Sequence, residues 1–341
     1  MVGKGFSIRR RRSAIGSELL EEVFLGEAAR LTRDDVVQKA DVPLERTRML
    51  WRALGFPDSQ PGEPAFTQSD VEALRLAARI ENDQLLGDGV AELLARVMGQ
   101  SMNRLAEALT EMLTDLMVDD AGLIDLAAKE PEKAIREAVN RTDGLLPDIE
   151  WLMTYAWRRH LLAAAQRALG GAAQDLPDEP VAVGFCDIVG YTTLTRDMSG
   201  QDLSKLVEVF ESSASDIVVG RGGRVIKTLG DEVMFVISTA EAAARVALEL
   251  AETFASDAVR VPAVRVGLAW GPALTHGGDL FGPVVNLASR CTGVARPNTV
   301  ACDREFAAQM DEVDGIEAVK LRTFRVRGYG HLAPYGVRRT G

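Results

Sequence analysis

The sequence predicts an α+β protein in two parts, an all-helical N-terminal half and a C-terminal half in which strands alternate with helices. From Glu18 to about Gly170, apolar residues recur with helical spacing almost throughout. Beyond a segment rich in Gly, Ala and Pro, short apolar runs typical of strands alternate with amphipathic stretches. We therefore expect a basic tail at 1–17, an all-helical domain at 18–169, a linker at 170–180 and an α+β domain at 181–341.

Helix-start patterns mark the N-terminal half. Thr32 is followed by Asp35, and Thr67 by Asp70, which is the spacing of a side-chain cap that bonds the first turn. Pro43 suits the first turn of another helix. The predicted helices cover 33–40, a stretch opening at 43, 71–80, 90–118, 131–139 and 148–169.

The pattern of the C-terminal half predicts short strands, a tight hairpin and three longer helices. The hairpin turns at Gly230-Asp231 between two apolar runs. The predicted strands cover 181–185, 224–228, 233–237 and 264–270, and the predicted helices cover 203–219, 240–254 and 284–292.

Size and charge narrow the class of protein. A chain of 341 residues fits two domains better than one core. The net charge of −11 is spread evenly, with 22 Lys/Arg against 28 Asp/Glu in residues 1–170 and 17 against 22 in residues 171–341. Neither half is therefore expected to coat DNA. The basic cluster Arg9–Arg12 is expected to be a solvated tail, with contact to an acidic lipid or nucleic acid as the alternative.

Cysteine usage and hydropathy favour a cytoplasmic location. Cys186, Cys291 and Cys302 show no CxxC spacing, so we expect three buried thiols in a reducing compartment. No apolar run approaches the roughly 20 residues that a membrane span needs. Acidic residues from Glu18 onward interrupt any signal-peptide core, and we expect no transmembrane segment.

Two clusters in the first part of the C-terminal half suggest a site for a phosphate and a cation. A strand ends at Asp187, and the turn Gly190-Tyr191-Thr192 leads into a helix whose N–H groups can face a phosphate. Asp231 lies on the hairpin turn after Lys227 and can share a metal with the Asp of a neighbouring strand.

Two further clusters follow. Asp279 precedes a helix on which Asn286 and Arg290 are four residues apart and share one face. Arg327 stands beside a glycine near the C-terminus. An Asp after a strand is most often a loop or cap residue, and an Asn/Arg pair is most often a solvated helix face. Four such clusters in order within one domain favour a site for a metal and a nucleotide.

Together these clusters resemble the class III nucleotidyl cyclases, over roughly Glu179 to Arg338. The resemblance implies a ferredoxin-like βαββαβ core that works as a head-to-tail homodimer with two active sites at the subunit interface. It also implies conversion of ATP to 3′,5′-cyclic AMP and pyrophosphate, with the metal Asp residues from one subunit and the purine-selecting and transition-state residues from the other.

The resemblance assigns roles residue by residue. Asp187, Ile188 and Asp231 match the positions that bind two Mg²⁺ or Mn²⁺ ions per active site, one activating the ribose 3′-hydroxyl and the other holding the triphosphate. Lys227 and Asp279 match the positions that select adenine, whereas guanylate-specific relatives commonly carry Glu and Cys there.

The remaining assignments concern the substrate and the transition state. Asn286 and Arg290 match the residues that orient the ribose and stabilise charge on the α-phosphate. Gly190, Tyr191 and Thr192 match a phosphate-binding turn, and Arg327 falls where the family often has a Lys. The alternatives are a guanylate cyclase, or a silent cyclase fold that serves only for dimerisation beside a helix-turn-helix-like regulator.

The helical half carries weaker signals. Residues 31–80 resemble the opening of a MerR-type helix-turn-helix, with Arg46, Arg48 and Arg52 on the second helix, but the acidic charge favours a packing role over DNA binding. The arrangement also resembles soluble cyclases whose N-terminal helical domain is autoregulatory, responds to pH and can hold a fatty acid.

Regulatory candidates follow from that resemblance. The apolar stripe of 90–118 is expected to be a dimer or bundle core, with a lipid tunnel as the alternative. His160, in the helix before the linker, and His276, three residues before Asp279, are the candidates for pH sensing.

Overall fold

The protein forms two compact units, Met1–Leu162 and Ala163–Gly341, in a computed structural model. The structure describes residues 18–82, 89–118, 126, 129–130, 133–134, 136–137, 144–171, 180–256, 261–326 and 330–340. The expected tail at 1–17, most of the expected helix at 131–139 and residues 172–179 of the expected linker lie outside the described residues.

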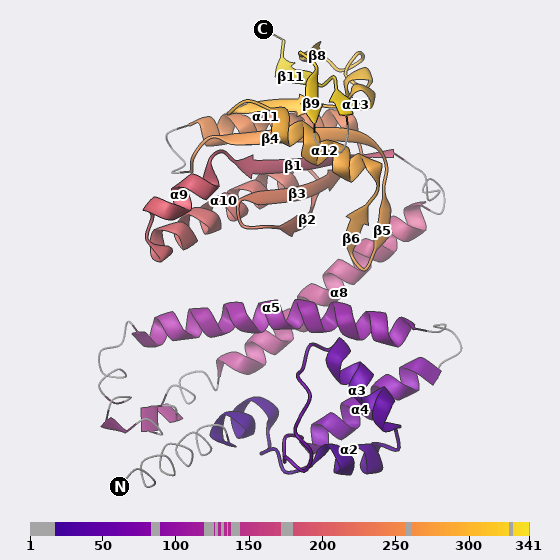
Figure 1. Ribbon diagram of the computed structural model, residues 1–341, viewed down its shortest axis with the longest axis vertical. Coiled ribbons are helices and arrows are strands. Elements are labelled where there is room, and N and C mark those ends of the chain that lie inside the picture. The colour runs from indigo at the N-terminus through magenta and orange to yellow at the C-terminus, as the bar shows by residue number, and fades with distance from the viewer. Residues whose placement is uncertain are drawn as a thin grey trace. The chain divides into compact units, whose positions relative to one another are not determined.

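The N-terminal unit is built from helices (Figure 1). They are α2 (Arg33–Ala40), α3 (Leu44–Ala53), α4 (Gln68–Asn82), α5 (Val90–Val118) and the first part of α8 (Leu145–Gly171). The helices expected from 33, 43, 71, 90 and 148 are therefore confirmed, although Pro43 is the N-cap of α3 rather than a member of its first turn. The helix α8 extends to Gly171, and the next strand already begins at Pro180.

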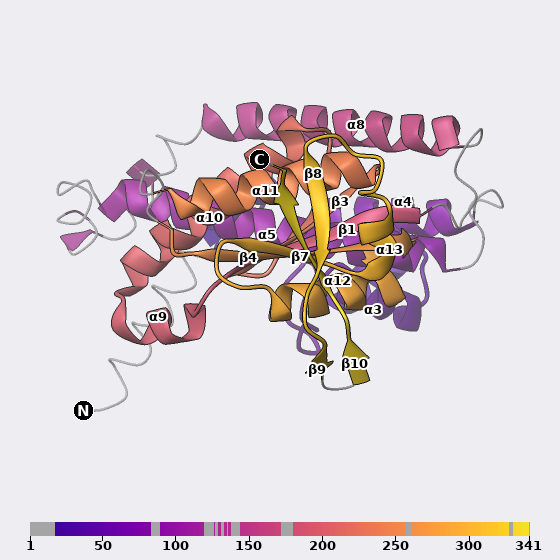
Figure 2. The same cartoon turned by 90° about the horizontal axis from the view of Figure 1, so that it is seen from above.

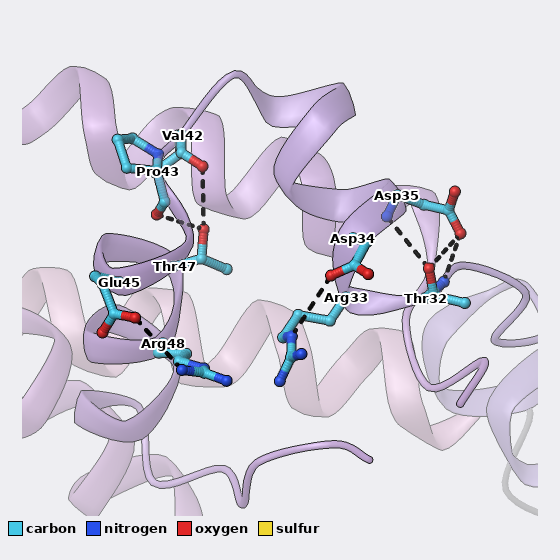
Figure 3. Close-up of polar contacts among 9 residues, drawn as sticks. All are labelled: Thr32, Arg33, Asp34, Asp35, Val42, Pro43, Glu45, Thr47 and Arg48. Carbon is cyan, nitrogen blue, oxygen red and sulfur yellow. Dashed lines mark hydrogen bonds and ion pairs between the residues drawn. The ribbon is translucent and has the colours of Figure 1, made fainter. Parts of the chain in front are cut away.

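Both predicted helix caps are present. The Thr32 hydroxyl accepts a hydrogen bond from the Asp35 N–H, and the Asp35 carboxylate accepts one from the Thr32 N–H (Figure 3). Thr67 and Asp70 repeat this exchange at the start of α4. Each cap satisfies backbone N–H groups that a helix start leaves unbonded, so two helix ends are fixed by local sequence.

The core of this unit lies between α2, α3 and α4. An antiparallel bridge joins Leu31 to Phe66 and brings the starts of α2 and α4 together. On α5, Gly99 approaches the end of α3 so closely that an added Cβ would lie 2.3 Å from the carbonyl oxygen of Leu54. A side chain at position 99 would therefore separate these two helices. The buried apolar residues are Val36, Ala40, Val42, Leu50, Phe66, Val71 and Leu74.

The C-terminal unit is centred on one seven-stranded sheet. Its order is β2-β3-β1-β4-β7-β11-β8, with β4 and β7 parallel and every other neighbouring pair antiparallel. The strands are β1 (Pro180–Ile188), β2 (Arg224–Thr228), β3 (Glu232–Ile237), β4 (Val264–Pro272), β7 (Thr299–Cys302), β8 (Ile316–Lys320) and β11 (Tyr335–Arg339).

Helices cover both faces of this sheet. One face packs against α10 (Gly200–Gly220) and α11 (Ala240–Ala255), and the other packs against α12 (Pro283–Val294). In Figure 2, α10 and α11 lie on one side of β4 and α12 on the other. Gly267 makes the close approach of α12 possible, because an added Cβ would lie 2.1 Å from the Thr292 nitrogen.

The predicted ferredoxin-like core is confirmed. The segment from β1 to β4 runs β1, α10, β2, β3, α11, β4, and its strands lie side by side in the order β2-β3-β1-β4. Each helix thus connects two parallel strands with a third strand between them. Beyond this core the chain adds strands at one edge of the sheet, the short helices α9 (Tyr191–Asp197) and α13 (Arg304–Ala308), and two small hairpins, β5 (Leu274–His276) with β6 (Asp279–Phe281) and β9 (Phe324–Val326) with β10 (Gly330–Leu332).

Two further expectations concern the thiols and the membrane. Cys186, Cys291 and Cys302 are all buried and free, as predicted. Among the residues that the structure describes, no helix has the length and apolar character needed to cross a bilayer.

Candidate active site

The end of β1 positions the first predicted metal ligand. Cys186 and Ile188 point into the core beneath α10 and α11. Side chains alternate along a strand, so Asp187 belongs to the opposite, α12 face, with Val183 and Phe185. Gly190 follows with a φ of 75°, a left-handed conformation that favours glycine, and is the N-cap of α9. The N–H groups of Tyr191 and Thr192 therefore belong to the first turn of α9, where no intrahelical partner is available.

The β2–β3 turn brings the second predicted ligand to the same place. Gly230 has a φ of 71°, and the Leu229 N–H donates to the Glu232 carbonyl across the turn at 2.8 Å. The Ile188 N–H donates to the backbone carbonyl of Asp231 at 2.9 Å. This bond fastens the turn to the end of β1, so the structure brings Asp187, Ile188 and Asp231 together.

Two charged residues that sequence reasoning missed complete this place. In the strand register, Asp187 lies opposite Glu232 on one side and opposite Arg265 on the other. The Arg265 guanidinium donates to the Asp187 carboxylate in an ion pair. We call Asp187, Asp231, Glu232 and Arg265 the carboxylate corner. The available signal was one charged residue in each otherwise apolar run, the first residue of 232–237 and the second residue of 264–270.

Negative charge accumulates in the carboxylate corner. Burial, followed by the nearby charges of Asp187 and Asp231, raises the pKa of Glu232 to about 7, against the opposing effects of Arg265 and Lys227. Burial also raises the pKa of Asp187 above its ordinary value, although the bond from Arg265 acts in the other direction. These carboxylates are thus short of positive charge.

The carboxylate corner fits a divalent cation that is coordinated partly by the protein and partly by phosphate groups of a bound substrate. Among the described residues, no group of three or more His, Cys, Asp or Glu side chains is arranged to hold a metal ion by itself. Mg²⁺ commonly takes only one or two protein carboxylates and completes its shell with water and substrate phosphate oxygens. Two carboxylates joined at one turn, with a deficit of positive charge, suit that kind of site.

A second ion pair lies on the β5–β6 hairpin and β2. The Lys227 ammonium donates to one oxygen of Asp279 at 2.6 Å, and the Leu280 N–H donates to the other at 2.8 Å. Partial burial acts to raise the pKa of Asp279, but these two bonds outweigh it and the pKa is lowered. His276 lies directly opposite Asp279 in the hairpin and is exposed.

The helix α12 presents the predicted transition-state residues. Gly282, with a φ of 136°, caps the helix and Pro283 occupies its first turn. Val284 and Ala288 are buried against the sheet, whereas Asn286 is exposed and Arg290 is half-buried. Within the described part of the chain, neither the Asn286 amide nor the Arg290 guanidinium has a hydrogen-bond or ion-pair partner. Both are available to a ligand.

Two predicted residues remain, Arg327 and His160. Arg327 lies outside the described residues. His160 is exposed on α8.

Comparison with known proteins identifies the family. The model of the adenylate and guanylate cyclase catalytic domain matches residues 174–338. An adenylate cyclase of Streptomyces coelicolor is 39% identical over 295 residues, which cover 85% of this chain and 74% of the relative. An adenylate cyclase of Glutamicibacter nicotianae is 34% identical over 331 residues, 93% of this chain and 80% of the relative. A relative in Mycobacterium tuberculosis named pH-sensitive adenylate cyclase is 31% identical over 317 residues, 89% of this chain and 77% of the relative.

The two relatives named adenylate cyclase are each more than 30% identical to this chain and are covered over more than two thirds of their length. The chain belongs to the class III nucleotidyl cyclases, among the adenylate cyclases of that family.

Proposed function

We propose that this enzyme converts ATP to 3′,5′-cyclic AMP and pyrophosphate at two sites completed by a homodimer. The observation that carries the choice of substrate is the Lys227–Asp279 pair. The adenine edge offers an acceptor at N1 and a donor at the 6-amino group, so a Lys donor beside an Asp acceptor matches it. Guanine reverses both groups, with a donor at N1 and an acceptor at O6, and would face two mismatched partners.

The chain supplies the groups that the reaction needs around the phosphates. The 3′-oxygen of the ribose attacks the α-phosphorus, the bond from that phosphorus to the bridging oxygen of the pyrophosphate breaks, and the 3′-hydroxyl proton passes to solvent. Arg290 would stabilise the charge that develops on the α-phosphate, and Asn286 would orient the ribose. Asp187 and Asp231, with the Ile188 carbonyl, would hold two divalent cations, Mg²⁺ or Mn²⁺. When bound, these cations supply activation of the 3′-hydroxyl and neutralisation of the leaving pyrophosphate.

The orientation of two side chains on α12 supports the homodimer. Asn286 and Arg290 point away from the buried face of their own helix. The chain carries one copy of each residue of the set, so two copies arranged head to tail complete two equivalent sites. A second copy would also cover apolar surface, because Trp151, Leu152 and Trp157 on α8 are each more than half exposed.

Mixing two inactive variants tests both the reaction and the shared site. Asp187→Asn and Arg290→Ala should each abolish formation of cyclic AMP from Mn-ATP. Co-expression should restore up to about a quarter of wild-type activity, because half of the dimers are mixed and each mixed dimer has one intact site. If neither the wild-type protein nor the mixture makes cyclic AMP, the chain is a silent dimerisation module. Active wild-type protein with an inactive mixture of folded variants would place each site within one copy.

Guanylate cyclase activity is the alternative from the same family. Parallel assays of the wild-type protein with Mn-ATP and Mn-GTP decide between them, and a higher kcat/KM for GTP would show that the Lys227–Asp279 pair does not select adenine.

We also propose that the helical half regulates the enzyme in response to pH. Support comes from the relative named pH-sensitive adenylate cyclase, which matches 89% of this chain. His160 lies on α8, the helix that precedes β1, and His276 lies beside Asp279, so both are candidates for the sensor. Replacing each with Gln should flatten the pH dependence of activity if that histidine is the sensor, whereas two unchanged profiles would exclude both.

DNA and a fatty acid are the other candidate ligands of the helical half. The arginines of the helix-turn-helix-like segment pair within the unit, Arg46 with Glu81, Arg48 with Glu45 and Arg52 with Asp58, which supports a packing role over DNA binding (Figure 3 shows Arg48 with Glu45). A cavity of about 580 Å³ near Leu31 and Phe66 also has Glu22, Glu27 and Arg30 in its lining, which does not suit an acyl chain. A fatty acid stays a prediction from the apolar stripe of α5 alone.

A further inference from the structure

The centre of the carboxylate corner is a row of three charged residues across neighbouring strands. Glu232 on β3, Asp187 on β1 and Arg265 on β4 lie directly opposite one another in the sheet register. All three belong to the α12 face, since Met234, Phe185 and Ala269 of the same strands are buried there. Asp187 thus has a carboxylate on one side and a guanidinium on the other.

Only part of the Arg265 guanidinium is hydrogen-bonded. One terminal nitrogen donates to an oxygen of Asp187, while its Nε is buried and has no hydrogen-bond partner. The side chains of Asp187 and Arg265 are 15% and 30% exposed, so the pair is held in a partly desolvated place. A buried donor without a partner costs free energy, so the bond to Asp187 is the contact that holds the guanidinium in this place.

Arg265 is also the cation committed to this corner. Lys227, the other nearby cation that affects Glu232, is bonded to Asp279. The Arg265 guanidinium bonds to Asp187 and its charge also acts on Glu232. Arg265 contacts one of the two Asp187 oxygens that would be available to a divalent cation.

We propose that Arg265 and the divalent cation compete for Asp187, so that Arg265 weakens metal binding to the nucleotide-free enzyme. This inference rests on the proposed metal site. For a divalent cation to bind, the guanidinium must leave the Asp187 oxygen, and it remains a positive charge beside the incoming cation. Arg265 acts through Asp187 and is in this respect a positioning residue. Its effect is to make metal binding depend on the arrival of the polyanionic substrate, whose charge offsets the repulsion.

The test is the affinity of the full-length, nucleotide-free protein for Mn²⁺, measured by electron paramagnetic resonance of free Mn²⁺ and by calorimetry. Arg265→Gln removes the charge and keeps an amide donor for Asp187, and Arg265→Met removes both. Each should bind Mn²⁺ about tenfold more tightly than the wild type, because a repelling charge and a competing ion pair are lost. Arg265→Lys should stay close to the wild type. The matched control is Arg338→Met, which removes the arginine of an exposed ion pair between Arg338 on β11 and Glu317 on β8.

The outcomes separate this inference from the proposed function. Unchanged or weaker Mn²⁺ binding in a folded Arg265→Gln variant, with normal binding by the wild type, overturns the competition and leaves Arg265 a structural tie between β1 and β4. Absence of Mn²⁺ binding by the wild type even with a non-hydrolysable ATP analogue would instead overturn the metal site itself. Should Arg265→Met fail to fold, Arg265→Gln alone decides, with a thermal unfolding transition as the check of its fold.

Discussion

The carboxylate corner and the Lys227–Asp279 pair handle charge in opposite ways. Asp187 and Lys227 lie on the same face of the sheet, on strands separated only by β3. In the carboxylate corner the Arg265 guanidinium bonds to Asp187 alone among the three carboxylates, and the pKa values of Asp187 and Glu232 are raised. In the pair, one ammonium and one backbone N–H satisfy one carboxylate, and the pKa of Asp279 is lowered.

This difference indicates what each place is built to receive. A place short of positive charge gains most from divalent cations, whose binding relieves the repulsion among its carboxylates. A balanced pair gains nothing from a further ion, but its donor and acceptor can be shared with the neutral edge of a base. In the proposed head-to-tail dimer, the carboxylate corner of one copy would receive the charged end of Mg-ATP, and the Lys227–Asp279 pair of the other copy would receive the base.

The largest expected effect comes from the carboxylate corner. Asp231→Asn keeps the shape of the turn and its backbone bond to Ile188, but removes a carboxylate from the proposed metal site. We expect kcat/KM for Mn-ATP to fall by about a thousandfold or more, because the cations supply both activation and charge neutralisation. The control is Asp216→Asn, an exposed position on α10. Activity within tenfold of the wild type would show that Asp231 is not a metal ligand.

A smaller effect, and one on selectivity, is expected at the pair. Lys227→Met removes the donor proposed for adenine N1, and the preference for ATP over GTP in kcat/KM should fall by roughly a hundredfold. Stability should change by only about 0–1 kcal/mol, because the Lys227 and Asp279 side chains are 34% and 32% exposed.

Paired assays with the two nucleotides, each over a full substrate range, measure the loss of selectivity. Arg338→Met breaks an exposed ion pair of the same kind and should leave the ratio unchanged. A variant that loses activity with ATP and GTP equally would mean that Lys227 supports the fold or the phosphates and does not read the base.

Sequence reasoning identified both residues of the Lys227–Asp279 pair but only two of the four residues of the carboxylate corner. The turn at Gly230-Asp231 and the strand end at Asp187 were predictable, because hydrophobic runs and a Gly turn are local signals. Arg265 and Glu232 were missed, because their roles depend on which residues lie opposite Asp187. Strand register joins positions far apart in the chain and is set by the packing of the whole sheet.

The same limit explains the elements that were not predicted. The strands β5 and β6 are three residues each, and most of their side chains are exposed, so they show no hydrophobic alternation. Only their pairing places Asp279 within reach of Lys227. The order of the core strands was predictable through the family resemblance, whereas the added strands at the far edge, from β7 onward, are short and lack a local pattern of their own.

The smallest effect is on stability and tests the charge deficit directly. The pKa of Glu232 is about 7 in the folded protein against an ordinary value of 4.5, so folding takes up a proton between these two values. The stability linked to the protonated carboxyl is complete below pH 4.5 and is lost as pH rises through 7. The glutamine of Glu232→Gln does not titrate, so the stability of this variant relative to the wild type should increase with pH.

Thermal unfolding in a chelator, at pH 5.5 and pH 8, measures this difference. After allowance for solvent screening, the gain of Glu232→Gln at pH 8 should be about 1–2 kcal/mol, or roughly 3–6 °C, with a smaller gain at pH 5.5. Glu208→Gln, exposed on α10, removes the same charge without the repulsion and should show no such growth. Saturating Mn²⁺ should shrink the gap, because cations bound at Asp187 and Asp231 offset the charges that raise the pKa of Glu232. If the difference in stability between Glu232→Gln and the wild type is the same at both pH values, the neighbours of Glu232 do not raise its pKa. The contrast with the Lys227–Asp279 pair would then rest on Asp187 alone.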